Sequence, residues 1–388
     1  MKLTTKNKIK VLFVAHYTDL YGANNSLLQM MLELRDRGVA PTVMLPLSPE
    51  AKGRNLIDEL KIHDIPYIKA PIHLVKWPSR LKVLPNYLLA ISELPSAFKA
   101  LEGKRFDLVH SNSSTVTTGA YLARRLKVPH VWHLREFGDL DYNLRTPFGK
   151  WFQKVLYRGD NTFVAISDKI RSHYKPYVGK QEIRRIYNGV KPMLPRVMDP
   201  GKLSVDFCIV GLLQPTKCQL DVLKAADILA NERGVRNFRL TIVGDGDPGY
   251  TGELKNYIRE KGLEDVVEMT GRIDNVPELL TRMDVGVVAS SHEAFGRVTV
   301  EYMLTGMAAL VSDGGANTEI VDDGKTGLVY RSGDVRNLAD RMESLVKDGD
   351  LLRRVAEAGK EHAENNFTSR ANSRAIGALY AELLGKEI

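Results

Sequence analysis

The chain has 388 residues, of which 44% are hydrophobic and 26% are charged, a composition that excludes disordered and membrane-embedded chains. A chain of this length is too long for one ordinary core, so we expect two domains. The first apolar run, Val11–Ala15, is too short for a signal peptide or a membrane span, which predicts a cytoplasmic protein. The cysteines Cys208 and Cys218 suggest neither a disulfide framework nor a zinc site.

The net charge of +8 is divided unevenly along the chain. Residues 1–190 carry 30 Lys and Arg against 16 Asp and Glu, whereas the remaining residues carry 25 against 31. The basic first half indicates a negatively charged partner, for which anionic lipid, a phosphorylated acceptor and nucleic acid are candidates. No helix-turn-helix, zinc-finger or RNA-binding signature favours nucleic acid, so we do not expect it as a partner.

Short apolar runs, which we interpret as strands, alternate with longer amphipathic stretches along the whole chain. Most runs are β-branched and lack polar alternation, as in strands that are buried on both faces. In the first half they are Val11–Ala15, Thr42–Leu45, Leu108–His110, His130–Leu134, Phe163–Ile166 and Ile183–Tyr187. In the second half they are Phe207–Val210, Leu240–Val243, Val266–Met269, Val285–Ala289, Ala308–Val311 and Leu328–Tyr330. This alternation predicts an α/β protein with parallel sheets covered by helices on both faces.

Residues 191–203 read as a linker between the halves. They contain three prolines and a Pro-Gly turn, and they show no strand or helix pattern. We therefore expect an N-terminal domain over 1–190 and a C-terminal domain over 204–370. Ligands of open α/β sheets bind beyond the carboxyl ends of the strands, so the loops that follow strands are the first candidates for a site.

The loop after the strand Val285–Ala289 leads into a helix and carries two carboxylates. Glu293 lies in the loop, and Glu301 lies one to two turns into a helix that we expect to begin near Gly296. The free amides and the positive end of that helix would suit a phosphate. From residue types alone, a solvated helix with surface glutamates explains the same residues.

A second loop follows the strand Phe207–Val210 and contains Gly211 and Lys217. A strand, a glycine turn and a lysine at a helix start can cradle a phosphate. An ordinary surface lysine is the alternative, and residue types alone do not separate the two.

The segment from Ser290 to Gly306 resembles the nucleotide-sugar loop of glycosyltransferase family 4, in which two glutamates have seven residues between them. The resemblance continues, in the family's order, through residues 242–246, 270–272, 312–321 and 323–328. It implies the GT-B fold, with two Rossmann-like parallel-sheet domains facing across a cleft. It also implies a final helix at about 371–384 that packs back on the first domain.

The resemblance implies a role for each matching residue. Glu301 would bind the ribose hydroxyls of the donor, and Glu293 would contact the transferred sugar. Lys217 would neutralise the departing diphosphate, with Arg297 as the candidate for a second cation. Donor binding would extend to Gly211, to Arg272 and Ile273 beside the base, and to the backbone amides of Phe295, Gly296, Arg297 and Val298.

The first half matches the family more loosely. Gly22, after the first strand, fits a glycine-rich loop that faces the donor phosphate and the acceptor in this family. Asn24, Asn25 or Ser26 would cap the helix that follows. His133, at a strand end, stands where a histidine commonly contacts the donor sugar, and a purely structural histidine is the alternative.

Two positions depart from the family pattern. Leu212 stands where many members have an arginine, and Cys218 stands where a glycine usually follows the lysine. This departure keeps open a catalytically weak or inactive partner subunit that only binds a nucleotide-sugar. A nucleotide-sugar 2-epimerase is the second alternative, and a nicotinamide-dependent dehydrogenase is the weakest because neither half opens with Gly-x-Gly-x-x-Gly.

The activity implied is retaining transfer of a sugar from a nucleotide-sugar, with a UDP-sugar favoured over a GDP-sugar. The acceptor would be a saccharide or a lipid-linked saccharide in surface polysaccharide or glycolipid synthesis. We predict no cofactor and no metal, because a helix end and Lys217 would stabilise the leaving diphosphate. Asp245 and Asp247 resemble a metal motif, but no third carboxylate or histidine stands at ligand spacing.

The basic segment from Lys76 to Arg105 suggests contact with an anionic membrane, as a peripheral protein on the inner face of the plasma membrane. Its basic residues are Lys76, Arg80, Lys82, Lys99, Lys104 and Arg105. They are interleaved with the apolar residues Trp77, Leu81, Leu84, Tyr87, Leu88, Leu89 and Phe98. The alternative is a set of helices whose apolar faces pack on the sheet and whose lysines are solvated.

Overall fold

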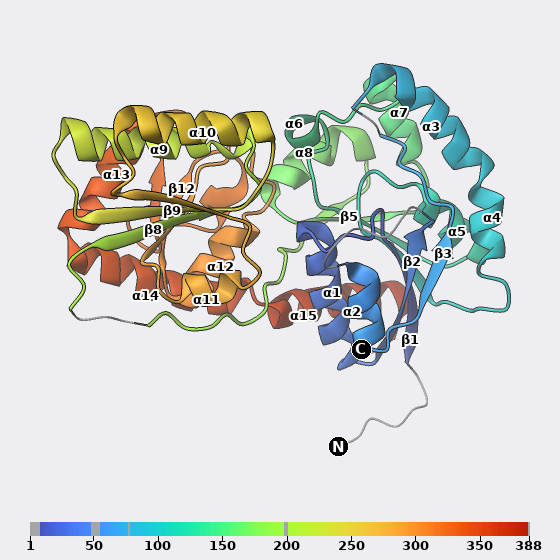
Figure 1. Cartoon of the computed structure of the whole chain (residues 1–388). Helices are drawn as coiled ribbons and strands as arrows, with labels where there is room; N and C mark the ends of the chain where they lie inside the picture. Colours follow the sequence, from blue (N-terminus) through green and yellow to red (C-terminus); the bar gives the residue numbers. More distant parts are fainter. Residues whose placement is uncertain (1–7, 48–54, 77, 198–200, 387–388) are drawn as a thin grey trace. The chain divides into compact units, whose positions relative to one another are not determined.

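The computed structural model describes residues 8–47, 55–76, 78–197 and 201–386. The chain divides into two compact units, the first formed by residues 1–189 and 369–388 and the second by residues 190–368. Each unit is a parallel sheet between layers of helices (Figure 1). Residues 198–200 of the expected linker lie outside the described residues, as does Trp77.

The first unit contains a seven-stranded parallel sheet in the order β3-β2-β1-β4-β5-β6-β7. Its strands are β1 (Ile9–Val14), β2 (Val39–Pro46), β3 (Tyr67–Ala70), β4 (Leu108–Ser111), β5 (His130–Leu134), β6 (Thr162–Ala165) and β7 (Ile183–Arg185). Side chains of β1 alternate between the faces, so that Val11 and Phe13 enter one apolar cluster and Leu12 and Val14 enter another. Burial of both faces explains the continuous apolar runs of the sequence.

Helices cover both faces of this sheet. One face is covered by α1 (Gly22–Arg35), α2 (Leu56–Ile62) and α15 (Ser369–Leu384), and the other by α4 (Leu94–Lys99) and α5 (Thr118–Leu126). The other helices of the unit are α3 (Arg80–Ser92), α6 (Asp139–Tyr142), α7 (Gly149–Leu156) and α8 (Asp168–Val178).

The final helix α15 packs beside α1, although the whole second unit separates them in sequence (Figure 1). The chain leaves the first unit at Gly189 and returns at Ser369, and a Cβ on Gly189 would lie only 2.5 Å from the Cα of Ser369. This close approach requires glycine. Tyr380 of α15 is fully buried, so the helix is part of the core of the first unit.

The twelve runs that the sequence predicts as strands all lie on strands of the two sheets, and the predicted α/β fold class is confirmed. The prediction missed β3, which lies at the edge of the first sheet. Its Lys69 is exposed while Ala70 is buried, and Pro66 and Pro71 flank it. An edge strand that is only partly covered lacks the continuous apolar run that marks a central strand.

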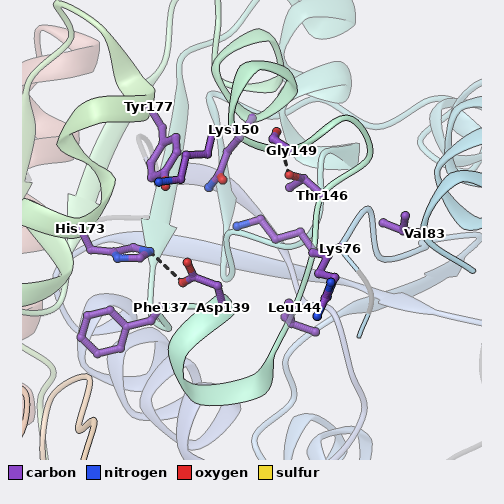
Figure 2. Close-up of a pocket in the computed structure, with 12 residues that line it drawn as sticks. Lys76, Val83, Phe137, Asp139, Leu144, Thr146, Gly149, Lys150, His173 and Tyr177 are labelled. Atoms are coloured by element: carbon purple, nitrogen blue, oxygen red, sulfur yellow. Dashed lines mark hydrogen bonds and ion pairs between the residues drawn. The ribbon is translucent and has the colours of Figure 1, made fainter. Parts of the chain in front are cut away.

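The structure of the segment from Lys76 to Arg105 corrects both the membrane interpretation, at Lys76, and its alternative, at α3. The side chain of Lys76 is buried in the wall of a cavity (Figure 2), so it does not lie on a surface that could face a membrane. The apolar face of α3 is instead solvent-exposed, with Leu81 87% and Leu88 58% exposed. The alternative in which this face packs on the sheet is therefore wrong for α3.

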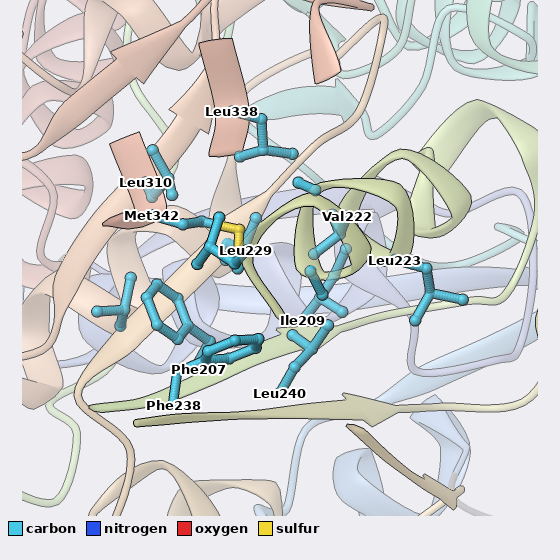
Figure 3. Packing of buried hydrophobic residues seen from close by; sticks show 14 of the residues in the cluster. Phe207, Ile209, Val222, Leu223, Leu229, Phe238, Leu240, Leu310, Leu338 and Met342 are labelled. Carbon is cyan, nitrogen blue, oxygen red and sulfur yellow. The ribbon is translucent and has the colours of Figure 1, made fainter. Parts of the chain in front are cut away.

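The second unit contains a six-stranded parallel sheet in the order β10-β9-β8-β11-β12-β13. Its strands are β8 (Val205–Val210), β9 (Phe238–Val243), β10 (Val267–Gly271), β11 (Val285–Val288), β12 (Ala308–Ser312) and β13 (Leu328–Tyr330). Figure 3 shows Phe207 and Leu240 of this sheet within one apolar cluster that also contains Val222, Leu229 and Met342 of the covering helices.

The helices of the second unit form two layers. One layer contains α9 (Gln219–Asp227), α10 (Pro248–Lys261) and α13 (Val335–Lys347), and the other contains α11 (Val276–Leu280), α12 (Arg297–Thr305) and α14 (Gly349–Asn366) (Figure 1). The helical pattern that extends to Leu229 in the sequence crosses from α9 into a short π-helix, Ile228–Glu232. Over the described part of the chain, no helix is both long and apolar enough to cross a membrane.

Candidate functional site

A pocket of the second unit lies where the strand order of the sheet reverses. β8 pairs with β9 on one side and with β11 on the other, so chain connections leave this point in opposite directions. Doubly wound sheets bind ligands at such switch points, beyond the carboxyl ends of the strands. The pocket brings together six of the predicted site residues: Gly211, Lys217, Glu293, Gly296, Arg297 and Val298.

Lys217 and Glu293 form an ion pair in this pocket. The Lys217 Nζ donates to Glu293 Oε2 over 3.0 Å, and the two side chains are 35% and 17% exposed. Lys217 ends a 3₁₀ turn, Pro215–Lys217, and the next residue, Cys218, has a left-handed backbone with φ +54°. Left-handed backbone favours glycine, which explains why glycine is the usual residue at this position and means that Cys218 is strained here.

The loop that carries Glu293 is held by a glycine turn after β12. Gly315 has φ +81°, and a Cβ there would lie 2.2 Å from the carbonyl oxygen of Glu293. The amide of Ala316 donates to that same oxygen over 2.7 Å. Gly315 therefore permits the close backbone approach that positions Glu293 in the pocket.

The helix α12 presents its N-terminus at the pocket. It begins at Arg297, directly after Gly296, which has φ +96° and is the N-cap, so the predicted start is confirmed. No acidic residue lies in the first turn, so no carboxylate of that turn neutralises the positive end of α12. Such an end is a ready site for a phosphate group.

Arg297 and Glu301 form a second ion pair, one turn apart on α12. Arg297 Nε lies 3.0 Å from Glu301 Oε1, and the side chains are 14% and 21% exposed. Burial raises the pKa of the Glu301 carboxyl, and the neighbouring Arg297 charge opposes that rise. The pocket thus has two cations, Lys217 and Arg297, each beside a carboxylate.

Three of the predicted donor-binding residues do not present a side chain to this pocket. The ring of Phe295 is buried against Phe367, with centroids 6.2 Å apart, so only its backbone is available in the loop. Arg272 and Ile273 follow β10 at the edge of the sheet and are not among the lining residues of the pocket. Their contact with a base stays a prediction.

Gly22, in the first unit, is the first residue of α1 and is exposed. A Cβ at this position would meet no atom within 4 Å, and the backbone is not left-handed, so the fold itself does not require glycine. Its predicted role toward a donor phosphate stays a prediction.

The predicted cap of α1 is wrong. The helix starts two to four positions earlier than Asn24, Asn25 and Ser26, and Tyr21 is its N-cap. Asn24 is buried and donates from Nδ2 to the carbonyl oxygens of Tyr17 and Asp19, over 3.0 and 2.7 Å. Its amide therefore holds the loop after β1 instead of capping the helix.

His133 lies near the end of β5 in a fully buried polar chain. Its Nδ1 is 3.0 Å from Nε2 of His110, and His110 Nδ1 is 2.6 Å from the hydroxyl of Tyr380 on α15. Arg135 Nη2 also reaches His133 Nδ1, over 3.3 Å. In the described residues, His133 Nε2 has no hydrogen-bond partner.

These hydrogen bonds define the tautomers of His133 and His110. Arg135 can only donate, so His133 Nδ1 accepts and its proton is on Nε2. His110 must then donate from Nε2 to His133, and its Nδ1 accepts from the Tyr380 hydroxyl. Burial and the Arg135 charge lower the pKa of His133 well below its usual value, so it stays neutral and offers an Nε2–H donor.

The sequence missed Gln219 as a pocket residue. It is 1% exposed, lines the pocket and donates from Nε2 to the carbonyl oxygen of Leu212 over 2.9 Å. Leu212 itself is 51% exposed and is not a lining residue. No sequence signal distinguishes Gln219 from a surface glutamine, because its burial depends on how α9 packs on the sheet.

One carboxylate of the Asp-Gly-Asp turn, that of Asp247, has a structural role. Asp247 caps α10 by accepting from the amide of Tyr250 over 2.8 Å. Across the described ranges, no group of three or more His, Cys, Asp and Glu side chains is arranged to hold a metal ion.

The fold and the pocket define a class of protein. Two doubly wound parallel sheets, one with the N-terminus of α12 beside a Lys–Glu pair at its switch point, match the architecture of GT-B glycosyltransferases. Residues 21–193 match the model described as Glycosyltransferase Family 4, and residues 202–362 match Glycosyl transferases group 1. The chain is a glycosyltransferase and belongs to glycosyltransferase family 4, which confirms the resemblance found in the sequence.

Known proteins extend this match over nearly the whole chain. A glycosyltransferase of Methanocaldococcus jannaschii is 25% identical over 87% of this chain and 89% of its own length. The UDP-Gal:alpha-D-GlcNAc-diphosphoundecaprenol alpha-1,3-galactosyltransferase of Escherichia coli is 24% identical over 76% of this chain and 80% of its own length. HepE of Anabaena, solved in complex with UDP and glucose, superposes with a TM-score of 0.76 at 22% identity, over 96% of this chain and 100% of HepE.

Proposed function

We propose that the protein transfers a sugar, with retention of configuration, from a UDP-sugar to a saccharide or lipid-linked acceptor in surface polysaccharide or glycolipid synthesis. The observation that carries the proposal is the switch-point pocket, where the start of α12 and the Lys217–Glu293 pair converge. The choice of UDP is supported by HepE, which binds UDP and glucose, and by the Escherichia coli relative, whose donor is UDP-Gal.

In this proposal the donor diphosphate lies at the start of α12, against the amides from Phe295 to Val298. Glu301 holds the ribose hydroxyls, oriented by its ion pair with Arg297. Glu293 contacts the transferred sugar, and His133 offers its Nε2–H to a sugar hydroxyl. The helix start thus meets the negatively charged diphosphate, and the carboxylates of Glu301 and Glu293 accept hydrogen bonds from hydroxyl groups.

The transfer step breaks the bond between the anomeric carbon and the diphosphate oxygen and forms a bond from that carbon to the acceptor oxygen on the same face. The electron pair of the broken bond stays on the diphosphate, which takes the proton of the acceptor hydroxyl. Lys217 and the start of α12 stabilise the growing negative charge. We propose that no metal is needed, because these groups supply the positive charge.

We also propose that the protein contacts an anionic membrane, and the support comes from exposed residues of the first unit. Exposed apolar residues of α3 lie close in sequence to exposed basic ones, namely Lys82, Lys99, Lys104 and Arg105. Each basic residue near an anionic surface contributes about 1 kcal/mol, so a few suffice for weak docking. Flotation with vesicles containing anionic lipid should retain the protein at low salt and release it at high salt. No retention at low salt would refute the membrane contact.

Calorimetric titration with UDP, GDP and ADP, each with excess chelator, tests the donor site. We expect UDP to bind without a divalent ion and Glu301→Ala to abolish that binding, because the ribose contact is lost. Preferential binding of GDP would reassign the donor, and a strict need for a divalent ion would refute the metal-free mechanism.

Turnover with UDP-sugars then separates the alternatives. Release of UDP that depends on an added saccharide or lipid-linked acceptor supports transfer. Nucleotide binding without any turnover would favour the inactive partner subunit, consistent with Leu212 in place of an arginine. Formation of a 2-epimer with no acceptor present would favour the epimerase.

A further inference from the structure

A cavity of about 400 Å³ is lined by residues of the first unit, and none of these lining residues is among those assigned to the donor. Its walls come from the start of α3, the α6–α7 segment and α8 (Figure 2). The polar residues of interest here are Lys76, Arg145, Lys150, Asp139 and His173. Neither the donor-site proposal nor the family match gives this cavity a role.

Lys76 is the most unusual group of the cavity. It is 3% exposed, and its Nζ donates to the hydroxyl oxygens of Ser114 at 3.0 Å, Tyr174 at 3.3 Å and Tyr157 at 3.4 Å. The Nζ also lies 5.2 and 5.9 Å from the ring centroids of Tyr174 and Tyr157. In the described residues it has no ion pair within 4 Å. Burial lowers the pKa of Lys76 to about 8, so the ammonium is still the main form at pH 7. A buried cation without a counter-ion is costly and marks a candidate anion site.

The carboxylates near Lys76 are already engaged elsewhere. Glu136 Oε1 accepts from Ser113 and Ser114, with the Ser114 amide at 2.8 Å and its hydroxyl at 2.6 Å. Asp141 accepts from the amides of Phe137 and Gly138, and burial raises its pKa to about 6. These groups moderate the positive potential at Lys76 without forming an ion pair with it.

Further donors line the same cavity. Arg145 Nε is buried and has no hydrogen-bond partner in the described residues, although a guanidinium normally finds acceptors for its N–H groups. Lys150 lies exposed at the start of α7. Asp139, the carboxylate that lines the cavity, pairs with His173 over 3.1 Å (Figure 2). Three basic side chains therefore line the cavity together with one carboxylate, Asp139. Burial lowers the pKa of His173, so its imidazole hydrogen-bonds Asp139 mainly as a neutral group.

The surface around the cavity is apolar. α3, which contributes Val83 to the lining, exposes Leu84 and Leu88, and α7 exposes Trp151 beside the preceding Phe148. Their exposed fractions are 41% and 58% for the leucines and 66% and 67% for the aromatic residues. The two helices are in contact through Tyr87 and Phe152, whose rings lie 4.7 Å apart. A cationic cavity that opens beside exposed apolar helices fits a ligand with a phosphate group and a hydrocarbon chain.

We propose that this cavity binds the phosphate or diphosphate group of a lipid-linked acceptor, through Lys76, Arg145 and Lys150, with the lipid chain against α3 and α7. The inference rests on the proposed function and narrows its acceptor to a lipid phosphate. The glycosyl group of the acceptor, not its phosphate, would receive the new sugar, so the cavity positions the acceptor and takes no part in bond breaking.

We test the lipid-phosphate proposal by calorimetric titration of the full-length protein at saturating UDP. The three ligands titrated are farnesyl diphosphate, inorganic diphosphate and farnesol. UDP fills the donor site, so that diphosphate binding there is not counted. We expect farnesyl diphosphate to bind at least tenfold more tightly than either inorganic diphosphate or farnesol. Lys76→Met and Arg145→Gln should each weaken the binding of farnesyl diphosphate by about tenfold, because each removes one charge-assisted contact. Lys61→Gln, at an exposed lysine of α2 that does not line the cavity, is the matched control and should not change the affinity for farnesyl diphosphate.

Lys150→Gln, on the exposed rim, keeps the test informative if Lys76→Met does not fold. Unchanged UDP binding and thermal unfolding would show that a variant is folded. Equal binding of inorganic and farnesyl diphosphate would refute the lipid part, and equal binding of farnesol would refute the phosphate part. Full retention of binding in all three variants would overturn the assignment. Failure of UDP to bind would instead count against the donor site, because titration without UDP still reports on the unit 1 variants.

Discussion

At the scale of single residues, the site depends on pairs that are far apart in sequence. Lys217 and Glu293 are 76 positions apart, yet their charged atoms lie 3.0 Å from each other. Each could be proposed alone, from the loop in which it stands and from the family resemblance. The ion pair between them could not, because it follows from β8 and β11 being neighbours in the sheet.

We predict that Lys217→Ala lowers kcat by about 10²–10³-fold, because it removes a fixed positive group from the leaving diphosphate. Steady-state release of UDP measures the effect. Lys224→Ala, at a partly exposed lysine of α9 that does not line the pocket, is the control and should keep normal turnover. Near-normal turnover in Lys217→Ala would refute the role assigned to it.

Tyr380 is predicted to be a positioning residue for His133. In Tyr380→Phe, His110 Nδ1 loses its donor, so Arg135 alone holds the proton of His133 on Nε2 and the other tautomer of His133 gains population. We expect a loss of about 1 kcal/mol in stability from the unpaired nitrogen, together with a lower kcat. The ¹⁵N chemical shifts of labelled histidine report the tautomer directly. An unchanged tautomer of His133 in this variant would show that Tyr380 has only a packing role.

At the scale of elements, the sequence located the central strands and the start of α12, but it misjudged places where local and tertiary preferences differ. Asn24 has the residue type of a cap, yet it is drawn into the loop after β1 by two carbonyl oxygens that only the folded loop brings near. β3 is too short and too polar to be recognised before its pairing with β2 is known.

The turn between Lys217 and α9 gives a stability prediction. Cys218 has a left-handed backbone, which costs a residue with a Cβ roughly 1–2 kcal/mol. Its thiol makes a weak contact with the Thr216 carbonyl oxygen and packs at the edge of the apolar cluster, which offsets part of that cost. Cys218→Gly should therefore raise the free energy of unfolding by up to about 1 kcal/mol. Cys218→Val should lower it by more than about 1 kcal/mol, since a β-branched residue fits this backbone poorly. Thermal unfolding followed by circular dichroism compares the two, and the opposite order would contradict the backbone argument.

At the scale of the whole molecule, a buried histidine cluster makes stability depend on pH. His110, His130 and His133 lie in the core of the first sheet, and burial lowers the pKa of each, that of His130 to about 4. The unfolded chain therefore binds more protons than the folded chain below about pH 6.5. Asp141, whose pKa is raised to about 6, acts in the opposite sense and offsets part of the effect.

We predict that the first unit loses stability as pH falls from 7 to 5, by up to about 1.4 kcal/mol per pH unit for each histidine. All three tryptophans belong to residues 1–189, so urea unfolding followed by tryptophan fluorescence reports on this unit. His130→Asn should reduce the pH dependence by removing one of the titrating groups. A stability that is constant between pH 7 and 5 would contradict the burial of these imidazoles as neutral groups.

The sequence by itself determined the fold class, the family and the loops that carry Lys217, Glu293 and Glu301. It could do so because buried parallel strands leave continuous apolar runs, and because a helix end that binds phosphate needs particular residues at fixed spacing. These are local properties, readable over about twenty residues.

Only the tertiary structure decided which groups meet. It paired Lys217 with Glu293, linked Tyr380 to His133 through His110, buried Gln219, and took Lys76 from an expected membrane surface into a cavity wall. It also left the apolar face of α3 exposed. The physical reason is that burial and contact depend on which strands neighbour each other and which helices cover them, and this order is a property of the folded chain that no local pattern contains.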